Sequence, residues 1–513
     1  MRSAPLVRLA GLTAAAALAL TACSATSPEP SGSGDTTTAP LLTIGSLTEP
    51  TSWDPAQANE GHFAPIYQSV YDTLIKREPD GSLSPMLATD WTLSDDKLTL
   101  QLDLRDDVTF TDGAVFNADA VKANMEHFQS ANGPLSNSLA SVESVEVVDD
   151  DTVAVHLSSP DPDLPISLTN AAGYMGSPDA LGSADIETTP VGSGPYVLDT
   201  DRSIVGSQIV FTRNPDYWGD PLPFDEVDFK IFTDETARLN ALTTGQVDFA
   251  ALNRASSALQ AQSAGLNAPE PFSTGWAGIL FFDRDGALLP ELADVRVREA
   301  LAIAIDREAI VDVSWQGLGQ QTSQVFGKDT LGYEPSLDDA YPYDPDKARE
   351  LLTEAGASNL TVTLPISNVF DPSIYDAIIQ NWEDIGVTVN RHEWGPGEAI
   401  PSMLKGEFPL AFMQLVQRPD WGNMNFLLTP DATWNPLGST NAELDGLIAQ
   451  YPTADEAGQA DLARQINEWV VDNYWFAPVL RPDQFNFYND TITVVPQVQQ
   501  AVPSIYNYAP SGQ

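Results

Sequence analysis

The chain has 513 residues with 72 acidic and 24 basic side chains, which gives a formal net charge of −48. This balance argues against binding to nucleic acid or to anionic lipid, because both depend on Lys and Arg. The length exceeds the roughly 250–300 residues at which a single core stops growing, so we expect two or more lobes.

The N-terminus has the pattern of an export signal. Arg2 and Arg8 form a basic region, and residues 9–20 form an apolar run that is too short to span a bilayer. The run ends in Leu-Thr-Ala before Cys23, which resembles a bacterial lipobox, and Cys23 is the only cysteine of the chain. A single thiol can form no internal disulfide in an exported protein. We therefore predict a signal peptide over 1–22 and lipid attachment at Cys23.

Residues 23–40 are rich in Ser, Thr, Pro and Gly and almost free of apolar side chains. Such a composition cannot bury enough surface to fold, and it predicts a flexible tether. Beyond it, no apolar run approaches the ~18 residues of a membrane span. We expect an exported body held at the outer face of the cytoplasmic membrane.

The body alternates between two hydrophobic periodicities. Two-residue alternation and short apolar runs predict strands at 42–45, 97–104, 151–157, 207–213, 226–232, 360–364 and 387–391. Helical spacing predicts helices at 63–75, 119–128, 236–243, 295–313, 345–355 and 374–385, with Asn117 as the N-cap of the second. This alternation favours an α/β fold with mostly parallel sheets.

Residues for catalysis are scarce. The four histidines (His62, His127, His156 and His392) are scattered and show no zinc spacing. No nucleophile elbow, phosphate loop or dinucleotide motif is present, and Cys23 is assigned to the anchor. We therefore expect no enzyme, no cofactor and no metal. A hydrolase that uses a pair of carboxylates stays open as a distant alternative.

Short motifs recur in a fixed order along the body. They are Glu49-Pro50, Trp53-Asp54-Pro55 and the segments 71–74, 85–91, 104–113, 192–196, 213–218, 294–301, 304–307 and 343–348. Turn or cap chemistry explains most of them, as at Asp112-Gly113, Asp294 and Asp344, so we interpret them as fold markers. Their order and spacing resemble the family 5 extracellular solute-binding proteins, which include peptide-, nickel-chelate- and some oligosaccharide-binding members.

The resemblance implies a type II periplasmic-binding-protein-like fold, with two α/β lobes around a ligand cleft and an inserted domain. It implies lobe I at 41–80, 188–272 and 483–513, an inserted domain II at 81–187, and lobe III at 273–482. The ligand would be enclosed between lobes by hinge closure.

The resemblance also indicates where a ligand would bind. In peptide-binding relatives an aspartate in a loop near residue 420 meets the ligand's α-amino group, and here Asp420 occupies that loop. The Asp-Pro that usually follows is replaced by Gly422-Asn423. Arg418 could pair with a ligand carboxylate, and aromatic rings could stack on a ligand. The predicted ligand-binding residues are Asp420, Trp421, Arg418, Trp276, Trp434, Glu49 and Trp53.

The function implied is that of a monomeric, lipid-anchored substrate-binding protein of an ABC importer. It would bind a short peptide and deliver it to permease subunits with their ATPases. The altered loop after Asp420 keeps a second hypothesis open, in which the same scaffold binds an oligosaccharide or another non-peptide solute.

Overall fold

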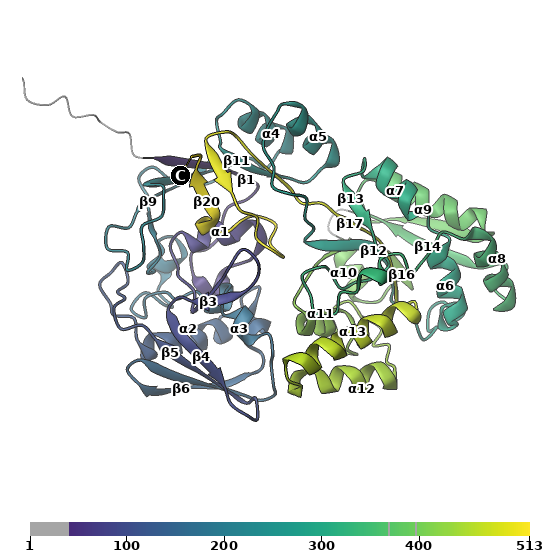
Figure 1. Cartoon of the computed structure of the whole chain (residues 1–513), viewed down its shortest axis with the longest axis horizontal. Coiled ribbons are helices and arrows are strands. Elements are labelled where there is room, and N and C mark those ends of the chain that lie inside the picture. The colour runs from purple at the N-terminus through teal and green to yellow at the C-terminus, as the bar shows by residue number, and fades with distance from the viewer. Residues whose placement is uncertain (1–39, 368–369, 396–397, 513) are drawn as a thin grey trace, which may run out of the picture. The chain divides into compact units, whose positions relative to one another are not determined.

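Separate apolar cores define two lobes in the computed structural model, which describes residues 40–367, 370–395 and 398–512. We call residues 40–266 and 485–512 the N-lobe, and residues 276–480 the C-lobe (Figure 1). The predicted signal peptide, Cys23 and the tether up to residue 39 lie outside the described residues. The finer boundaries of lobe I and domain II stay a prediction.

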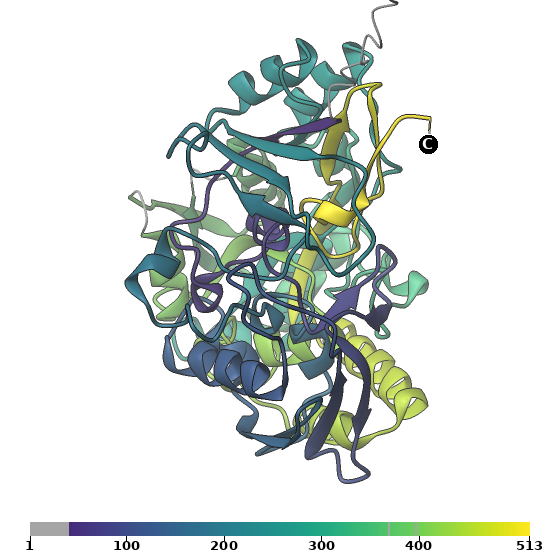
Figure 2. The ribbon, with the colours of Figure 1, turned by 90° about the vertical axis from the view of Figure 1, so that its left-hand side faces the viewer.

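The larger N-lobe sheet joins strands from distant parts of the chain. Its order is β18-β11-β1-β10-β9-β8. The strands are β1 (Leu41–Ser46), β8 (Tyr196–Leu198), β9 (Gln208–Arg213), β10 (Glu226–Ile231), β11 (Phe249–Leu252) and β18 (Phe485–Tyr488). Strand β18 brings the C-terminal segment back to the N-lobe, where it pairs with β11 (Figure 2).

A second N-lobe sheet has the order β4-β5-β7-β6 and lies beside helix α2 (Ala118–Ser130). Its strands are β4 (Ala88–Leu93), β5 (Thr99–Leu104), β6 (Val142–Asp149) and β7 (Thr152–Leu157), and a hairpin pairs β2 (Ile75–Arg77) with β3 (Leu83–Pro85). The shorter elements are α1 (Ala64–Gln68), α3 (Leu164–Ser167), α4 (Glu235–Thr243), α5 (Ala255–Ser263), β19 (Ile492–Val494) and β20 (Tyr508–Pro510).

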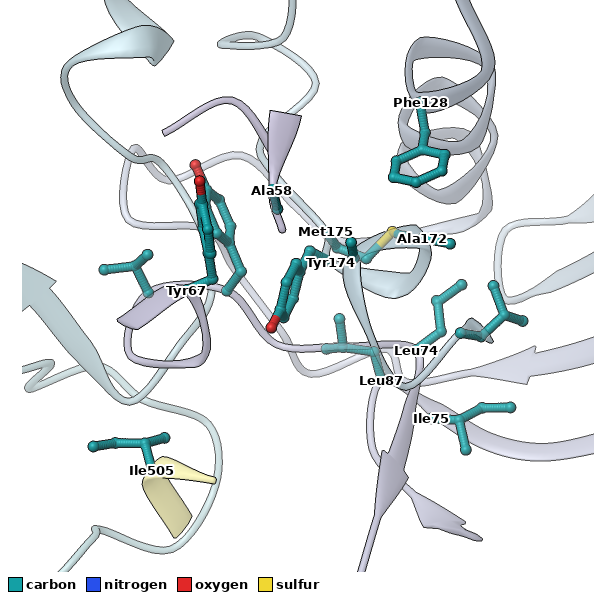
Figure 3. Close-up of a cluster of buried hydrophobic side chains, with 14 of the residues drawn as sticks. Ala58, Tyr67, Leu74, Ile75, Leu87, Phe128, Ala172, Tyr174, Met175 and Ile505 are labelled. Atoms are coloured by element: carbon teal, nitrogen blue, oxygen red, sulfur yellow. The ribbon is translucent and has the colours of Figure 1, made fainter. Parts of the chain in front are cut away.

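One hydrophobic core joins the two N-lobe sheets. Figure 3 shows part of it, where Tyr67 and Tyr174 lie among aliphatic side chains with their ring centroids 6.0 Å apart. The Tyr67 hydroxyl donates to the Ser52 carbonyl at 2.8 Å, so its polar end is satisfied inside the core. The 88–157 sheet therefore packs as part of the N-lobe.

A buried carboxylate links distant segments of this core. Asp72 accepts hydrogen bonds from the indole of Trp218 at 2.7 Å and the hydroxyl of Ser193 at 2.9 Å, and from the hydroxyls of Tyr506 at 3.1 Å and Tyr217 at 3.3 Å. Burial raises the pKa of Asp72 to about 6, and the four donors oppose that rise. This network attaches the C-terminal segment to the N-lobe.

The C-lobe contains a four-stranded sheet of order β13-β17-β12-β16 and a parallel pair, β14-β15. The strands are β12 (Gly275–Phe281), β13 (Gly319–Gln321), β14 (Thr361–Ile366), β15 (Thr388–Glu393), β16 (Leu410–Val416) and β17 (Phe476–Pro482). The helices are α6 (Val295–Ile303), α7 (Arg307–Ser314), α8 (Pro345–Glu354), α9 (Pro372–Asp384), α10 (Ala399–Leu404), α11 (Asp420–Leu427), α12 (Ala442–Gln450) and α13 (Glu456–Asp472).

The α/β class is confirmed, but three expectations of detail are wrong. Among the described strands only β1–β10, β1–β11 and β14–β15 pair in parallel, so the sheets are mostly antiparallel. Short connections such as those of β4–β5 and β6–β7 allow only antiparallel pairing. The predicted helix 295–313 is two helices, and the predicted helix 63–75 is only the short α1, preceded by a 3-10 turn.

Two neighbouring segments connect the lobes, residues 267–275 and 481–484 (Figure 1). The Gln484 amide donates to the Phe272 carbonyl at 2.7 Å, and the Thr274 hydroxyl donates to the Gln484 side chain at 3.2 Å. We call these two segments the hinge.

Candidate functional site

Charged side chains of both signs meet where the lobes face one another. Glu60, Arg77 and Asp163 come from the N-lobe, whereas Asp329 and Arg418 come from the C-lobe. Arg77 interacts electrostatically with Glu60, Asp329 and Asp163, and Arg418 interacts with Glu60 and Asp163. Four of these side chains are half-buried, and Asp329 is exposed. We call this set the interlobe cluster.

Direct hydrogen bonds also cross from lobe to lobe. Asp163 Oδ2 accepts the backbone N–H of Gly422 at 2.7 Å. The side-chain amide of Gln499 donates to the Asp329 carbonyl at 3.2 Å, and the ammonium of Lys97 donates to the Ala454 carbonyl. These contacts place the two inner faces close enough for one small ligand to touch both.

Burial affects the protonation of the interlobe cluster. It raises the pKa of Glu60, and the guanidinium groups of Arg418 and Arg77 partly oppose this. Burial also raises the pKa of Asp163 to about 7, and the nearby Asp161 carboxylate adds to the rise. Perturbed carboxyls of this kind are common where a protein binds or reacts with a ligand.

A pocket of about 120 Å³ lies at the hinge end of the C-lobe. Hinge residues Phe272 and Ser273 line one part of it, and Lys328, Asp329 and Gln417 line another. The pocket is large enough for a few water-sized groups and offers both charges and amide donors. Asp329 connects it with the interlobe cluster.

Asp420 lies at the start of α11, and its carboxylate bonds within the C-lobe. One oxygen accepts the Leu331 N–H at 2.9 Å and the other accepts the Gly332 N–H at 2.8 Å. Asp420 is only 6% exposed, and burial raises its pKa. In this arrangement both oxygens hold the 331–332 backbone, and a ligand contact by Asp420 stays a prediction.

Two neighbours of Asp420 lie against aromatic rings. The guanidinium of Arg418 lies 4.2 Å from the ring centre of Phe426, and its Nε has no hydrogen-bond partner in the part of the chain described. Trp421 is half-buried and stacks on Tyr451 with the rings 2° from parallel. Asp420, Trp421 and Arg418 are thus brought together in one segment that faces the N-lobe through Gly422.

The other predicted site residues lie apart from this segment or within a core. Trp276 is 1% exposed and packs on Phe476 in the C-lobe core. Trp434 packs on Phe426, and Trp53 packs between Tyr67 and Phe211 in the N-lobe core. The Glu49 carboxylate accepts the Gly206 N–H at 2.9 Å. Ligand contacts by these four residues stay a prediction.

Glu60, Arg77, Asp163 and Asp329 were not predicted from the sequence. Their positions are widely separated along the chain, and 72 acidic residues offer no means of selecting three. The one available signal was at Asp163, where an aspartate before Leu164-Pro165 has the pattern of a helix start. Its side chain makes no cap bond to α3, which leaves the carboxylate available to the C-lobe.

Neither a membrane-spanning helix nor a metal site is present in the described ranges. No helix there is both long and apolar enough to cross a membrane. Nor do residues 40–367, 370–395 and 398–512 contain a group of three or more His, Cys, Asp or Glu side chains placed to hold a metal ion.

Comparison with known proteins gives a family match and many relatives. The sequence model of the bacterial extracellular solute-binding proteins, family 5 Middle, matches residues 82–435. A glutathione-binding protein of Salmonella typhi is 34% identical over 312 residues, which cover 60% of this chain and 59% of the relative. The di/tripeptide-binding protein 1 of Pseudomonas aeruginosa is 30% identical over 385 residues, covering 67% of this chain and 70% of the relative. The chain thus spans about 59% of the glutathione-binding relative's length.

Solved structures share the fold across nearly the whole chain. The ABC transporter substrate-binding protein CtaP of Listeria monocytogenes superposes with a TM-score of 0.80 at 22% identity, covering 92% of this chain and 99% of that one. DppA of Helicobacter pylori in complex with the peptide STSA gives a TM-score of 0.74 at 20% identity, covering 92% and 98%. NikA of Brucella suis in complex with Fe(III)-EDTA gives 0.78 at 22% identity, covering 92% and 100%. At these identities the likeness shows the fold alone.

Proposed function

Because the chain belongs to the bacterial extracellular solute-binding proteins of family 5, we propose that it is the substrate-binding lipoprotein of an ABC importer and that its ligand is a short peptide. Peptide ligands are named for two relatives, the glutathione-binding and the di/tripeptide-binding proteins. Attachment to the membrane through Cys23 and delivery to permease subunits belong to the same proposal. They rest on the lipobox-like sequence and on the family.

The interlobe cluster is the observation that carries the choice of a peptide. A short peptide is a zwitterion with an ammonium group at one end and a carboxylate at the other. Arg77 and Arg418 suit the carboxylate, and Glu60 suits the ammonium group. Because these partners come from both lobes, a peptide that bound them would favour the closed arrangement over the open one. The hinge would allow that closure.

Isothermal titration with di- to pentapeptides tests the proposal. We expect binding that N-acetylation or C-amidation of the peptide weakens, because each removes one charge from the ligand. Arg418→Gln should weaken binding by about 10- to 100-fold, the worth of one hydrogen bond to a charged group. Arg464→Gln is the matched control, since the Arg464 side chain is 41% exposed and pairs with Asp461 on α13, away from the interlobe cluster.

The absence of heat with every peptide would overturn the peptide assignment while leaving the family unchanged. If cello- or xylo-oligosaccharides raise the melting temperature instead, the ligand is a sugar. If a peptide is returned cleaved, as detected by mass spectrometry, the protein is a hydrolase and not a receptor.

A further inference from the structure

The contact between Asp163 and Gly422 differs from the other links between the lobes because it joins a titratable side chain to a helix start. Asp163 lies just before α3 in the N-lobe, and Gly422 lies in the first turn of α11 in the C-lobe. The Asp163 carboxylate accepts the Gly422 N–H at 2.7 Å. Backbone N–H groups in the first turn of a helix have no partner within the helix, so an acceptor from outside satisfies one of them.

Gly422 allows the lobes to approach this closely. A Cβ added at this position would lie 2.9 Å from Asp163 Oδ2 and 3.4 Å from Arg418 Cβ. Gly422 lies within α11, where alanine is the better helix former by about 1 kcal/mol. Glycine here thus costs helix stability and leaves room for the carboxylate of the opposite lobe.

Charged groups on several elements face Asp163. Asp161 lies on its own loop, Arg418 and Asp420 lie at the start of α11, Arg77 lies on β2, and the phenol of Tyr451 lies beyond α12. Burial is the main cause that raises the pKa of Asp163, and Asp161 and Asp420 add to it. The Gly422 N–H and Arg418 act in the opposite direction without restoring the ordinary value.

We propose that Asp163 is an interlobe latch, and that the lobes close upon it with uptake of a proton. The latch is the hydrogen bond between Asp163 Oδ2 and the Gly422 N–H. A protonated carboxyl keeps an oxygen that can accept this bond, so the latch survives protonation. Closure therefore strengthens as the medium becomes more acidic than neutral. Stronger retention of a ligand at acidic pH rests on the proposed function, whereas the closure itself does not.

The direction of the pH dependence follows from the pKa of Asp163 in the open and in the closed arrangement of the lobes. In open lobes Asp163 would be in water with an ordinary pKa of about 3.9, and in the closed arrangement its pKa is about 7. The closed state binds the proton more tightly. Protonation therefore stabilises the closed state over the open one increasingly as the pH falls from 7 towards 4, and this stabilisation is absent above pH 7. Between pH 8 and pH 6, the ratio of closed to open molecules should rise about tenfold.

Small-angle X-ray scattering of the purified full chain, with Cys23→Ser to exclude lipid and with no ligand added, tests the latch. We expect the radius of gyration to fall between pH 8 and pH 6. Asp163→Asn is permanently neutral, so it should be more compact than the wild type at pH 8 and show a smaller pH response, which Glu60 alone would supply. Asp161→Asn removes a neighbouring negative charge, so the midpoint should move to lower pH.

Gly422→Ala provides a variant that does not alter any charge. Its added Cβ should displace the Asp163 carboxylate and weaken closure at both pH values, and its melting temperature shows whether it is folded. Gly446→Ala in α12 is the matched control, because a Cβ there meets nothing within 4 Å. It should behave like the wild type.

Two results would overturn the latch. One is a wild-type radius of gyration that does not change with pH, and the other is an Asp163→Asn protein that responds to pH as strongly as the wild type. Neither depends on a peptide, so failure of the peptide titration leaves this test intact. Conversely, peptide binding with equal affinity in wild type and Asp163→Asn at both pH values would support the proposed function and remove the latch.

Discussion

The carboxylate of Asp420 has a task inside the C-lobe that does not require a ligand. Its two oxygens accept the N–H groups of Leu331 and Gly332, which fixes the loop that carries Asp329 and Lys328 towards the hinge pocket. Asp420 would therefore act on a ligand through the residues that this loop positions. At the scale of single residues, Asp420 would position the candidate site, and other side chains would contact a ligand.

Asp420→Asn tests this structural role. The amide can accept one of the two N–H groups but presents a donor to the other, so one hydrogen bond to a charged group is lost. Such bonds contribute about 1.5–3 kcal/mol. We expect a loss of about 1.5 kcal/mol in the free energy of unfolding, at the lower end of this range. The reason is that the cost of burying the Asp420 charge already offsets part of the stabilisation by its hydrogen bonds. Urea denaturation measures it, with the exposed Asp431→Asn as the control. Unchanged stability with weaker peptide binding would assign Asp420 to the ligand instead.

Among the elements, strand β12 has one position that leaves no room for a side chain. Gly278 lies in this strand between β16 and β17, where the pairing with β17 shifts register. A Cβ at Gly278 would lie 2.5 Å from the Cα of Pro478, and real Cβ atoms do not approach neighbours so closely. Because β12 and β17 carry core side chains of the C-lobe, any shift of this backbone affects that core.

Gly278→Ala should destabilise the protein by about 1–3 kcal/mol, the usual cost of overpacking. The comparison is Gly446→Ala, where alanine meets open space and should be neutral or stabilising by up to about 1 kcal/mol. Chemical denaturation of both variants provides the measurement. Equal stability of the two would mean that the strands separate without cost, in contradiction to the packing described.

Local signals in the sequence predicted elements well where capping residues were present. Asn117, Asp294 and Asp344 each accept the backbone N–H that an N-cap should accept. The same chemistry explains the wrong prediction of one helix over 295–313, because Asp306 accepts the Ala309 N–H and begins α7. Apolar spacing continues through this break, so periodicity alone conceals it.

Tertiary contacts decided the elements that the sequence did not predict. The segment after α1 has helical apolar spacing, but its backbone N–H groups at Leu74 and Ile75 donate to Gly173 and Leu168. These partners are about a hundred residues away, and no local pattern indicates them. Parallel or antiparallel pairing is likewise decided by which strands meet, which explains why the sheet direction was predicted wrongly.

At the scale of the whole molecule, the site arises only from folding. Glu60, Arg77, Asp163, Asp329 and Arg418 come from two lobes and from separate loops, and no spacing in the sequence links them. The order of the motifs was sufficient to predict the family and the fold, because the motifs that mark both are distributed along the whole body of the chain. The charged side chains of the candidate site meet between the lobes, so identifying them required the structure.

Separate cores in the N-lobe and C-lobe predict that the two lobes unfold separately, because large chains with several cores depart from two-state behaviour. Differential scanning calorimetry should resolve two transitions. Gly278→Ala should lower only one of them, and Val153→Ala in the N-lobe core should lower only the other. For lobes of this size, each kcal/mol corresponds to a shift of about 2–4 °C. A ligand that contacts both lobes should raise both transitions and bring them together. A single transition that both substitutions shift equally would show instead that the contacts across the interlobe cluster couple the lobes into one cooperative unit.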